Sequence, residues 1–341
     1  MVLQTGEVSI DDKVHFLQQP KAYSHQADDI ISKETHMSWV FLVNGFVYKL
    51  KKPVAYDLFD HRTLESRFVN SREEIRINQS LAGDIYIGIV PLVLTKDGAL
   101  QLEGRGKNVD WLVKMKRIPN EIMLDHVIQQ RSINTDVLQK AAQLLIGFYK
   151  TAKPVLMDAS QYITKLETDI RMNEGQFQNL SFQFYPQRVK ESSRVLLTFL
   201  SYHKSLFQER IKNRKIIDAH GDLRPEHICL GPDPVIIDRL EFCRELRVMD
   251  IAEELAFLSM ECEILGNIHA GQVFIDEYIK ATGDAVADSL FHFYKSKKAV
   301  VRAYLVARHV EEQQYSRDPK WMAKAHAYLS IAEKYCTKLA D

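Results

Sequence analysis

The sequence predicts an α+β fold of two lobes, a β-rich lobe followed by a mainly helical one. Short apolar runs separated by turn residues fill the first third, and segments whose apolar residues repeat about every 3.6 positions fill the remainder. The chain has 341 residues, 46% of them hydrophobic, which is enough for two buried cores. We expect the lobes to comprise residues 1–115 and 116–341.

The first lobe is predicted to be β-rich with one helix. Asn44 and Gly45 separate two β-rich runs, and Asn-Gly is typical of a tight hairpin turn. The predicted strands are residues 39–43, 46–52, 85–94, 100–102 and 111–115, and the predicted helix is 63–81. Residues 1–35 are polar and mixed, so a helix and a loop are expected there.

The second lobe is predicted to be helical apart from short strands. The expected helices are residues 124–130, 135–152, 159–173, 187–213, 269–281, 284–315 and 319–338. Residues 250–253 resemble a capping box before another helix. Two short apolar runs, 228–230 and 235–237, surround Gly-Pro-Asp-Pro and predict a hairpin.

Charge and composition exclude several classes of protein. Lysine plus arginine and aspartate plus glutamate both number 45, and the absence of a basic excess argues against a nucleic-acid partner. No apolar run is long enough for a membrane span and no signal pattern opens the chain, so we expect no membrane partner and a cytoplasmic location. The four cysteines are scattered, which predicts reduced, packed thiols.

Two aspartates flank the predicted hairpin. Asp222 lies in His-Gly-Asp-Leu just before it, and Asp238 ends its second strand. Phosphoryl-transfer enzymes use such a pair, one carboxylate to accept the proton of a substrate hydroxyl and the other to hold the metal ion on the nucleotide phosphates. His227 occupies the position where that loop pattern has asparagine. The order of lobes, with this loop in the second, predicts a bilobal protein-kinase-like fold.

A kinase-like site also needs a lysine on a strand and a glutamate on a helix to orient it. Lys49 ends a β-rich run, and Lys51 lies on the same strand face as an alternative. Glu73 and Glu74 are the candidate partners. Glu74 is preferred because it precedes Leu81 by two helical turns and so shares its face.

The sequence indicates the nucleotide-binding residues less clearly than the charged ones, because it has no glycine-rich phosphate-binding motif. Adenine is expected near Met115 and Arg117, at the junction of the lobes. Arg224 is expected to meet either a phosphate or a carboxylate. Glu241 is either a second metal ligand or a partner of Asp238.

Several motifs together resemble a known family. They are the H-G-D-L loop with the I-D-x-x-E that follows it, and residues 35–42, 47–54, 73–78, 84–88 and 113–117. The chain resembles the aminoglycoside phosphotransferase and choline kinase superfamily, and most closely its uncharacterised bacterial aminoglycoside-phosphotransferase-like group. The resemblance covers about residues 35–310. It implies a bilobal kinase fold and ATP-dependent phosphorylation of a small-molecule hydroxyl or amine.

The resemblance also implies residue roles. Asp222 takes the place of the catalytic base, Asp238 that of the metal ligand, Lys49 that of the phosphate-binding lysine, and Glu74 that of its partner. His227 departs from the family's asparagine, and its imidazole favours Mn²⁺ over the expected Mg²⁺ if it binds metal. Some members carry a C-terminal P-loop ATPase domain. This chain contains no P-loop, so such an ATPase partner is expected to be either a separate protein or absent.

The predicted function is therefore a phosphotransferase that uses ATP and Mg²⁺, or Mn²⁺, and a small-molecule acceptor. The alternative is a pseudokinase that binds nucleotide or a protein without transfer, which His227 and the missing glycine-rich loop favour. Two further interpretations concern charged residues of the helical lobe. Arg302 is expected in a surface ion pair. Four acids could line an acidic acceptor groove or simply face solvent: Glu253, Glu254, Glu261 and Glu263.

Overall fold

The computed structural model describes residues 8–24, 27–56, 58–180, 186–311 and 319–340. The chain divides into two compact units. The first unit consists of Met1–Ile122 and Val235–Glu245, and the second of Met123–Pro234 and Leu246–Asp341. The chain therefore enters the first unit a second time, with a short segment that carries Asp238.

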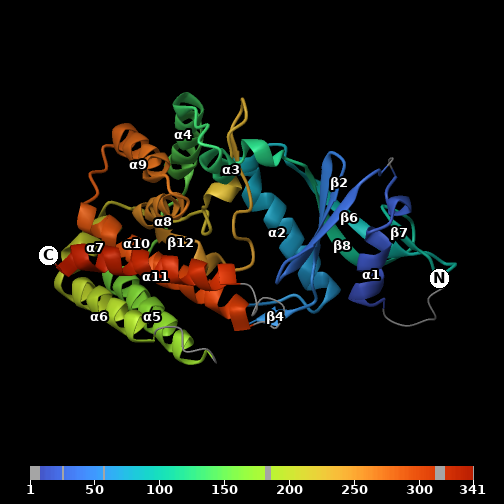
Figure 1. The fold of residues 1–341 in the computed structure, drawn as a ribbon. Helices are drawn as coiled ribbons and strands as arrows, with labels where there is room; N and C mark the ends of the chain where they lie inside the picture. The colour runs from blue at the N-terminus through green and yellow to red at the C-terminus, as the bar shows by residue number, and fades with distance from the viewer. Residues whose placement is uncertain (1–7, 25–26, 57, 181–185, 312–318, 341) are drawn as a thin grey trace. The chain divides into compact units, whose positions relative to one another are not determined.

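The first unit is built on an antiparallel sheet with the strand order β1-β2-β3-β8-β6-β7 (Figure 1). Its strands are β1 (Ile30–Glu34), β2 (Ser38–Val43), β3 (Phe46–Lys51), β6 (Tyr86–Leu94), β7 (Leu100–Leu102) and β8 (Lys107–Lys116). The other elements are α1 (Ile10–Leu17), η1 (Pro20–Ala22), the hairpin of β4 (Ala55–Tyr56) and β5 (Phe59–Asp60), α2 (Leu64–Ala82), η2 (Asn120–Ile122) and β11 (Val235–Ile236). Asn44, in the β2–β3 turn, has a φ of 51°.

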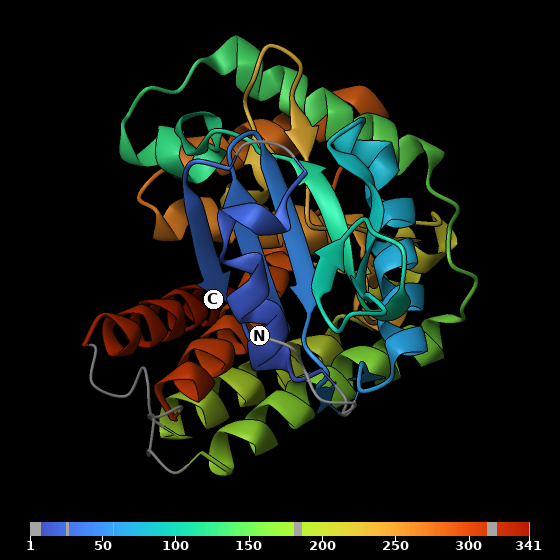
Figure 2. The same ribbon diagram turned by 90° about the vertical axis from the view of Figure 1, so that its right-hand side faces the viewer.

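Helices cover both faces of this sheet. Helix α1 lies against one face of the sheet (Figure 2). Its Val14 and Leu17 share a buried cluster with Leu50 and Leu112. On the other face, α2 contributes Ala82 to a cluster that includes Val113. Since successive side chains of a strand point to opposite faces, neighbouring residues of β3 and β8 face different helices.

The second unit is mainly helical (Figure 1). Its helices are α3 (Leu124–Gln129), α4 (Thr135–Thr151), α5 (Ala159–Gln178), α6 (Pro186–Tyr202), α7 (Lys204–Lys212), α8 (Ile251–Ile264), α9 (Ile268–Thr282), α10 (Asp288–Glu311) and α11 (Pro319–Ala340). Shorter elements are β9 (Ile216–Asp218), which pairs with β12 (Val248–Asp250), η3 (Pro225–His227) and β10 (Ile228–Cys229). The remaining short helix is η4 (Arg244–Leu246).

A core of α8, α10 and α11 supports the second unit. Phe257 of α8 is buried with Ala303 and Ala307 of α10 and with Ala332 of α11. Alanines along α10 and α11 let these helices approach closely. Helix α8 of this core also carries Glu254, which accepts a hydrogen bond from the loop that contains Asp222.

Several local features differ from the sequence predictions, among them a strand, a helix boundary and a helix cap. β1 lies within the region expected to hold only a helix and a loop, because its strand pairing with β2 outweighs its polar composition. The predicted helix 187–213 is two helices, α6 and α7, interrupted at His203. Asp250 does N-cap α8, but Glu253 forms no capping box and instead binds Lys297 at 3.0 Å.

Two further predictions concern the state of the cysteines and the presence of membrane-spanning segments. All four cysteines are free and buried, as predicted. Within the described ranges, none of the helices combines the length and the apolar composition that crossing a bilayer requires.

Candidate functional site

The predicted lysines lie side by side on β3, facing α2. Tyr48 and Leu50 are buried in the cluster on the α1 face. The alternation of the strand therefore directs Lys49 and Lys51 to the opposite face. Both strand positions that the sequence offers for the lysine consequently reach the same helix.

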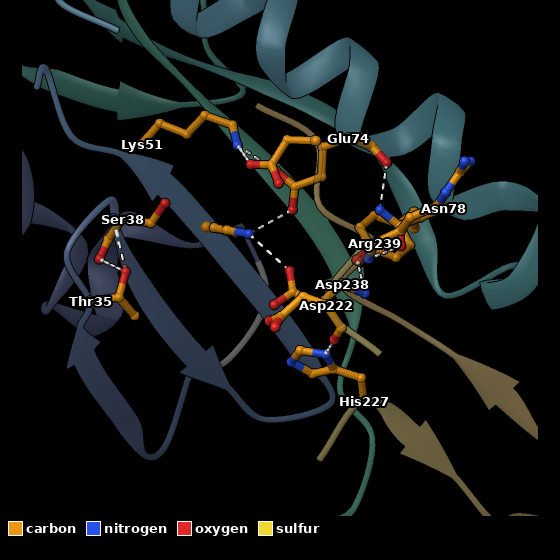
Figure 3. A network of polar contacts seen from close by, with 12 residues as sticks. Thr35, Ser38, Lys51, Glu74, Asn78, Asp222, His227, Asp238 and Arg239 are labelled. Atoms are coloured by element: carbon orange, nitrogen blue, oxygen red, sulfur yellow. Dashed lines mark hydrogen bonds and ion pairs between the residues drawn. The ribbon is translucent and has the colours of Figure 1, made fainter. Parts of the chain in front are cut away.

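Glu74 of α2 accepts from both lysines. Its Oε1 lies 2.9 Å from Lys49 Nζ and its Oε2 lies 2.6 Å from Lys51 Nζ (Figure 3). Glu74 is fully buried, whereas Glu73 lies on the outer face and pairs with Arg76. The helical period decides between the two glutamates, because Glu74 shares its buried face with Leu81.

The segment that re-enters the first unit completes this cluster. Lys49 Nζ lies 3.3 Å from Asp238 Oδ1, and Lys51 Nζ lies 2.5 Å from Glu241 Oε1. We name these five residues the lysine–carboxylate cluster: Lys49, Lys51, Glu74, Asp238 and Glu241. Burial lowers the pKa of Lys49, but the carboxylates of the cluster outweigh it and hold that pKa well above its usual value. Lys49 is thus a permanent cation.

The backbone of Asp238 is fixed in an uncommon conformation. Its φ is 61°, in the left-handed region that few residues other than glycine adopt without strain. Its N–H donates to the hydroxyl of Tyr86 at 3.1 Å, and the next N–H, of Arg239, donates to Asn78 Oδ1 at 2.9 Å (Figure 3). These contacts hold the Asp238 carboxylate in place, with 46% of the side chain exposed. An exposed carboxylate with fixed geometry suits a hard divalent cation.

The adenine-contact candidates lie at the end of β8. Met115 pairs with Val47 and with Tyr86 in the sheet. The N–H of Lys116 donates to the carbonyl of Ile85, and the N–H of Arg117 donates to the carbonyl of Gly45, both at 2.8 Å. These two N–H groups are therefore engaged in the sheet, and they can read a base edge only if those hydrogen bonds open.

In the second unit, a glutamate of α8 holds the H-G-D loop (residues 220–227) through a hydrogen bond. Gly221 has a φ of 90°, which a residue with a Cβ would adopt only with strain. Its N–H donates to Glu254 Oε1 at 2.8 Å, and Tyr149 donates its hydroxyl to Glu254 Oε2 at 2.8 Å. A buried carboxylate thus sets the conformation of the residue before Asp222.

Asp222 is held by its own loop. Arg224 Nε donates to Asp222 Oδ2 at 3.1 Å, and Arg224 also pairs with Glu226. Burial raises the pKa of Asp222, but Arg224, His227 and Arg302 outweigh it and leave the pKa below its usual value. Asp222 is consequently ionised at neutral pH, as an acceptor for a substrate hydroxyl must be.

Both ring nitrogens of His227 are engaged within the loop. Nδ1 lies 2.8 Å from the carbonyl oxygen of Asp222 (Figure 3). A carbonyl only accepts, so Nδ1 carries the proton and Nε2 accepts from Arg224 at 3.2 Å. Binding of a metal ion by Nε2 would therefore require Arg224 to move. Among the described residues there is no group of three or more histidine, cysteine, aspartate or glutamate side chains that could hold a metal ion.

Arg302 and Glu261 pair with each other in the second unit, a contact that the sequence did not indicate. Arg302 Nε lies 3.0 Å from Glu261 Oε1, and its guanidinium stacks over the ring of Tyr328. Only 13% of the Arg302 side chain is exposed, so the expectation of a surface pair is wrong. The sequence of α10 around Arg302 does not indicate that this side chain is buried, because its partners come from α8 and α11.

The four glutamates of α8 do not form a solvent-exposed surface of the helix. Glu253 and Glu254 are buried and pair with Lys297 and Tyr149, respectively. Glu261 accepts from Tyr328, and Glu263 accepts from Lys334 and Tyr335. Each acid therefore has a protein partner. The prediction that they line an acceptor groove has no support from these contacts.

Comparison with known proteins gives relatives without an assigned activity. No family model matches the sequence. Uncharacterized proteins of Mycobacterium tuberculosis and Mycobacterium bovis are each 29% identical over 307 residues, which is 89% of this chain and 59% of theirs. The chain thus spans less than two thirds of the length of these curated relatives.

Solved structures show which fold this is. A choline kinase from Cryptosporidium parvum matches with a TM-score of 0.54 at 10% identity, covering 92% of this chain and 90% of that one. The chain therefore has the fold of this choline kinase. A glucosamine kinase in complex with glucosamine, ADP and inorganic phosphate covers 97% and 87% (TM-score 0.50, 12% identity). The AMP-bound spectinomycin phosphotransferase APH(9)-Ia covers 95% and 98% (TM-score 0.50, 12% identity). The prediction of a bilobal kinase-like fold is confirmed.

Proposed function

We propose that this protein is an ATP-dependent phosphotransferase that transfers the γ-phosphoryl group to a hydroxyl, or an amine, of a small molecule. The lysine–carboxylate cluster is the observation that carries the proposal. It brings a strand lysine, a helix glutamate and an exposed aspartate together from three separate parts of the sequence. Phosphoryl transfer requires this set of charges, and the structurally similar proteins include kinases of small molecules.

Within the first unit, Lys49 is proposed to bind the nucleotide phosphates and Asp238 to hold the divalent ion. Lys49 is a permanent cation with 16% of its side chain exposed, and the Asp238 side chain is 46% exposed. When bound, Mg²⁺ or Mn²⁺ neutralises charge on the phosphates. Met115 and Arg117 stay proposed as adenine contacts through groups that the sheet does not occupy.

Within the second unit, Asp222 is proposed to orient the acceptor hydroxyl and to take its proton as the new O–P bond forms and the bond to ADP breaks. Arg224 is proposed to stabilise charge on the transferring phosphoryl group, since its guanidinium is hydrogen-bonded to Asp222, the proposed base. His227 is proposed to orient Arg224 through its Nε2 atom. It is proposed to bind the metal ion only if Arg224 moves away from that atom.

A second candidate function is nucleotide binding without transfer. The observation that favours it is the ion pair between Arg224 and Asp222, which occupies one oxygen of the proposed base. A catalytic protein must share that oxygen with the acceptor or release it. Under this alternative the first unit still binds nucleotide.

Calorimetric titration of ATP and GTP, each with Mg²⁺ and with Mn²⁺, tests nucleotide binding first. Phosphoryl transfer is then measured over a panel of amino alcohols, amino sugars and hydroxy acids, with Asp222→Ala beside the unmodified protein. We expect metal-dependent ATP binding in both proteins and transfer only in the unmodified one. Binding without transfer across the panel would favour the second candidate, and no binding with either metal would contradict both.

A further inference from the structure

Two lysines of one strand share a single buried glutamate. Lys49 takes Oε1 of Glu74 and Lys51 takes Oε2, so each carboxylate oxygen has its own cation. The lysines differ in exposure. Lys49 has 16% of its side chain accessible, whereas Lys51 has 1% and is among the most buried large side chains of the described residues. Lys51 therefore has no route to a bound nucleotide.

Each lysine also has a second carboxylate partner, which is Asp238 for Lys49 and Glu241 for Lys51. Glu241 Oε1 lies 2.5 Å from Lys51 Nζ, and only 8% of the Glu241 side chain is exposed. Glu241 follows Asp238 by three residues in the segment that re-enters the first unit. Lys51 thus joins α2 to the segment that carries the proposed metal ligand.

The charges of the cluster explain why a second lysine is needed. Three carboxylates face two lysines. A buried carboxylate without a cation is costly, so Glu74 held by Lys49 alone would bind that lysine firmly. Nucleotide phosphates would then compete with Glu74 for the one accessible ammonium group. With Lys51 on its other oxygen, Glu74 is compensated even when Lys49 turns to another anion.

We propose that Lys51 is a positioning residue that compensates Glu74 and Glu241, and so leaves the Lys49 ammonium available to bind phosphate. The inference rests on the proposed function of Lys49. It assigns the two strand lysines different tasks, one to the ligand and one to the protein. It also gives Glu241 a structural partner in place of a metal.

A purely structural role for Lys51 is the rival explanation. Phe242 packs against Phe59 of the β4–β5 hairpin in a tilted arrangement, with ring centroids 5.0 Å apart, so the same segment is also held by apolar contacts. If Lys51 only stabilised this packing, its loss would lower stability and leave the Lys49 ammonium unchanged. To distinguish the two explanations, the experiment must therefore measure how available the Lys49 ammonium group is.

The decisive comparison is Glu241→Gln against the double variant Lys51→Met/Glu241→Gln. Removing the charge of Glu241 first avoids leaving that acid buried without a cation, which could unfold Lys51→Met alone. In Glu241→Gln, Lys51 still compensates Glu74, so we expect Mg²⁺-ATP affinity within about threefold of the unmodified protein. In the double variant, Glu74 depends on Lys49, and we expect affinity at least tenfold lower.

Lys52→Met is the matched control. Lys52 is next in the chain, but it pairs with the half-exposed Glu34. Its loss should leave ATP affinity within about twofold, as expected for a surface pair. Equal affinity in Glu241→Gln and the double variant, with both folded, would overturn the proposal.

A second readout does not depend on nucleotide binding. Acetylation of Lys49 by acetic anhydride, followed by mass spectrometry of the protein without nucleotide, reports how firmly its ammonium is paired. We expect Lys49 to react several-fold more slowly in the double variant than in Glu241→Gln. Equal rates would contradict the role of Lys51. Absence of ATP binding in the unmodified protein would contradict the proposed function alone, because the labelling comparison would still decide the inference.

Discussion

Arg224 donates from Nε to Oδ2 of Asp222 at 3.1 Å, so the proposed base carries a cation two residues along its own loop. The same guanidinium reaches Glu226 and lies 3.2 Å from His227 Nε2. Arg224 thus links the ionisation of Asp222 to the orientation of His227. A loop arranged in this way can deliver positive charge to a phosphoryl group and keep its base ionised.

Replacing Arg224 with methionine should raise the pKa of Asp222, because the foremost attractive partner of that carboxylate is lost. Transfer requires ionised Asp222, so the acid limb of the pH–rate profile should move to higher pH. We also expect the rate to fall about 10²–10³-fold, as when one charge-stabilising donor is removed.

Arg194→Met is the control for that variant, since Arg194 pairs with Glu191 on an exposed helix surface. It should leave the profile unchanged. A carboxyl titration by NMR measures Asp222 directly, and an unaltered midpoint in Arg224→Met would show that Arg224 does not control its ionisation.

Asp238 can be tested for charge and for conformation separately. Asp238→Asn and Asp238→Gly both remove the carboxylate but tolerate a positive φ, and both should weaken metal-dependent ATP binding at least tenfold. Asp238→Ala should bind equally weakly and, in addition, be less stable than Asp238→Gly by about 1 kcal/mol, because a Cβ is disfavoured at a φ of 61°.

Calorimetry with and without Mg²⁺, beside urea denaturation, gives both quantities for Asp238. ATP affinity that keeps its metal dependence in Asp238→Asn would exclude this residue as the metal ligand. Equal stability of the alanine and glycine variants would show that the backbone relaxes at this position.

Stability at low pH should depend on Glu253. Burial raises its pKa, but Lys297, Lys298 and Lys165 outweigh it and lower the pKa to about 2 from an ordinary value of 4.5. A carboxylate whose pKa is depressed on folding contributes stability fully above its unfolded value, and this is lost as the pH falls through 4.5 toward 2. Glu253→Gln should therefore cost roughly 3 kcal/mol at pH 7 and flatten the acid slope.

Denaturant midpoints between pH 2 and 7 measure this slope. Glu167→Gln is the control, because Glu167 pairs with Arg171 at an exposed position of α5 and should change stability by less than about 0.5 kcal/mol. Identical acid slopes for Glu253→Gln and the unmodified protein would show that the Glu253–Lys297 pair contributes no net stability.

Gly271 should not tolerate a methyl group. A Cβ there would lie 2.5 Å from the Cα of Ser259, where α9 packs on α8. Gly271→Ala should cost about 1–3 kcal/mol by overpacking. Gly147→Ala, at an exposed position of α4 with nothing within 4 Å of the new Cβ, should instead stabilise by about 0.5–1 kcal/mol. Thermal denaturation of both variants tests the contrast, and a stable Gly271→Ala would mean that α9 shifts freely.

Local sequence patterns determined the elements and most of the candidate side chains. The alternation of β3 places Lys49 and Lys51 on one face, and the helical period places Glu74 rather than Glu73 beside Leu81. Both follow from repeats that span a few residues. Asp222 was found in the same way, from a short loop motif before a strand.

Tertiary structure alone decided which charges meet. Lys51 and Glu241 are 190 residues apart in the chain, and no local period relates them. Arg302 is buried only because α8 and α11 supply Glu261 and Tyr328. The cost of a buried charge depends on every group around it, and those groups come from distant parts of the chain. A sequence therefore shows where a charge lies along an element, while folding determines which charge it meets and whether water reaches it.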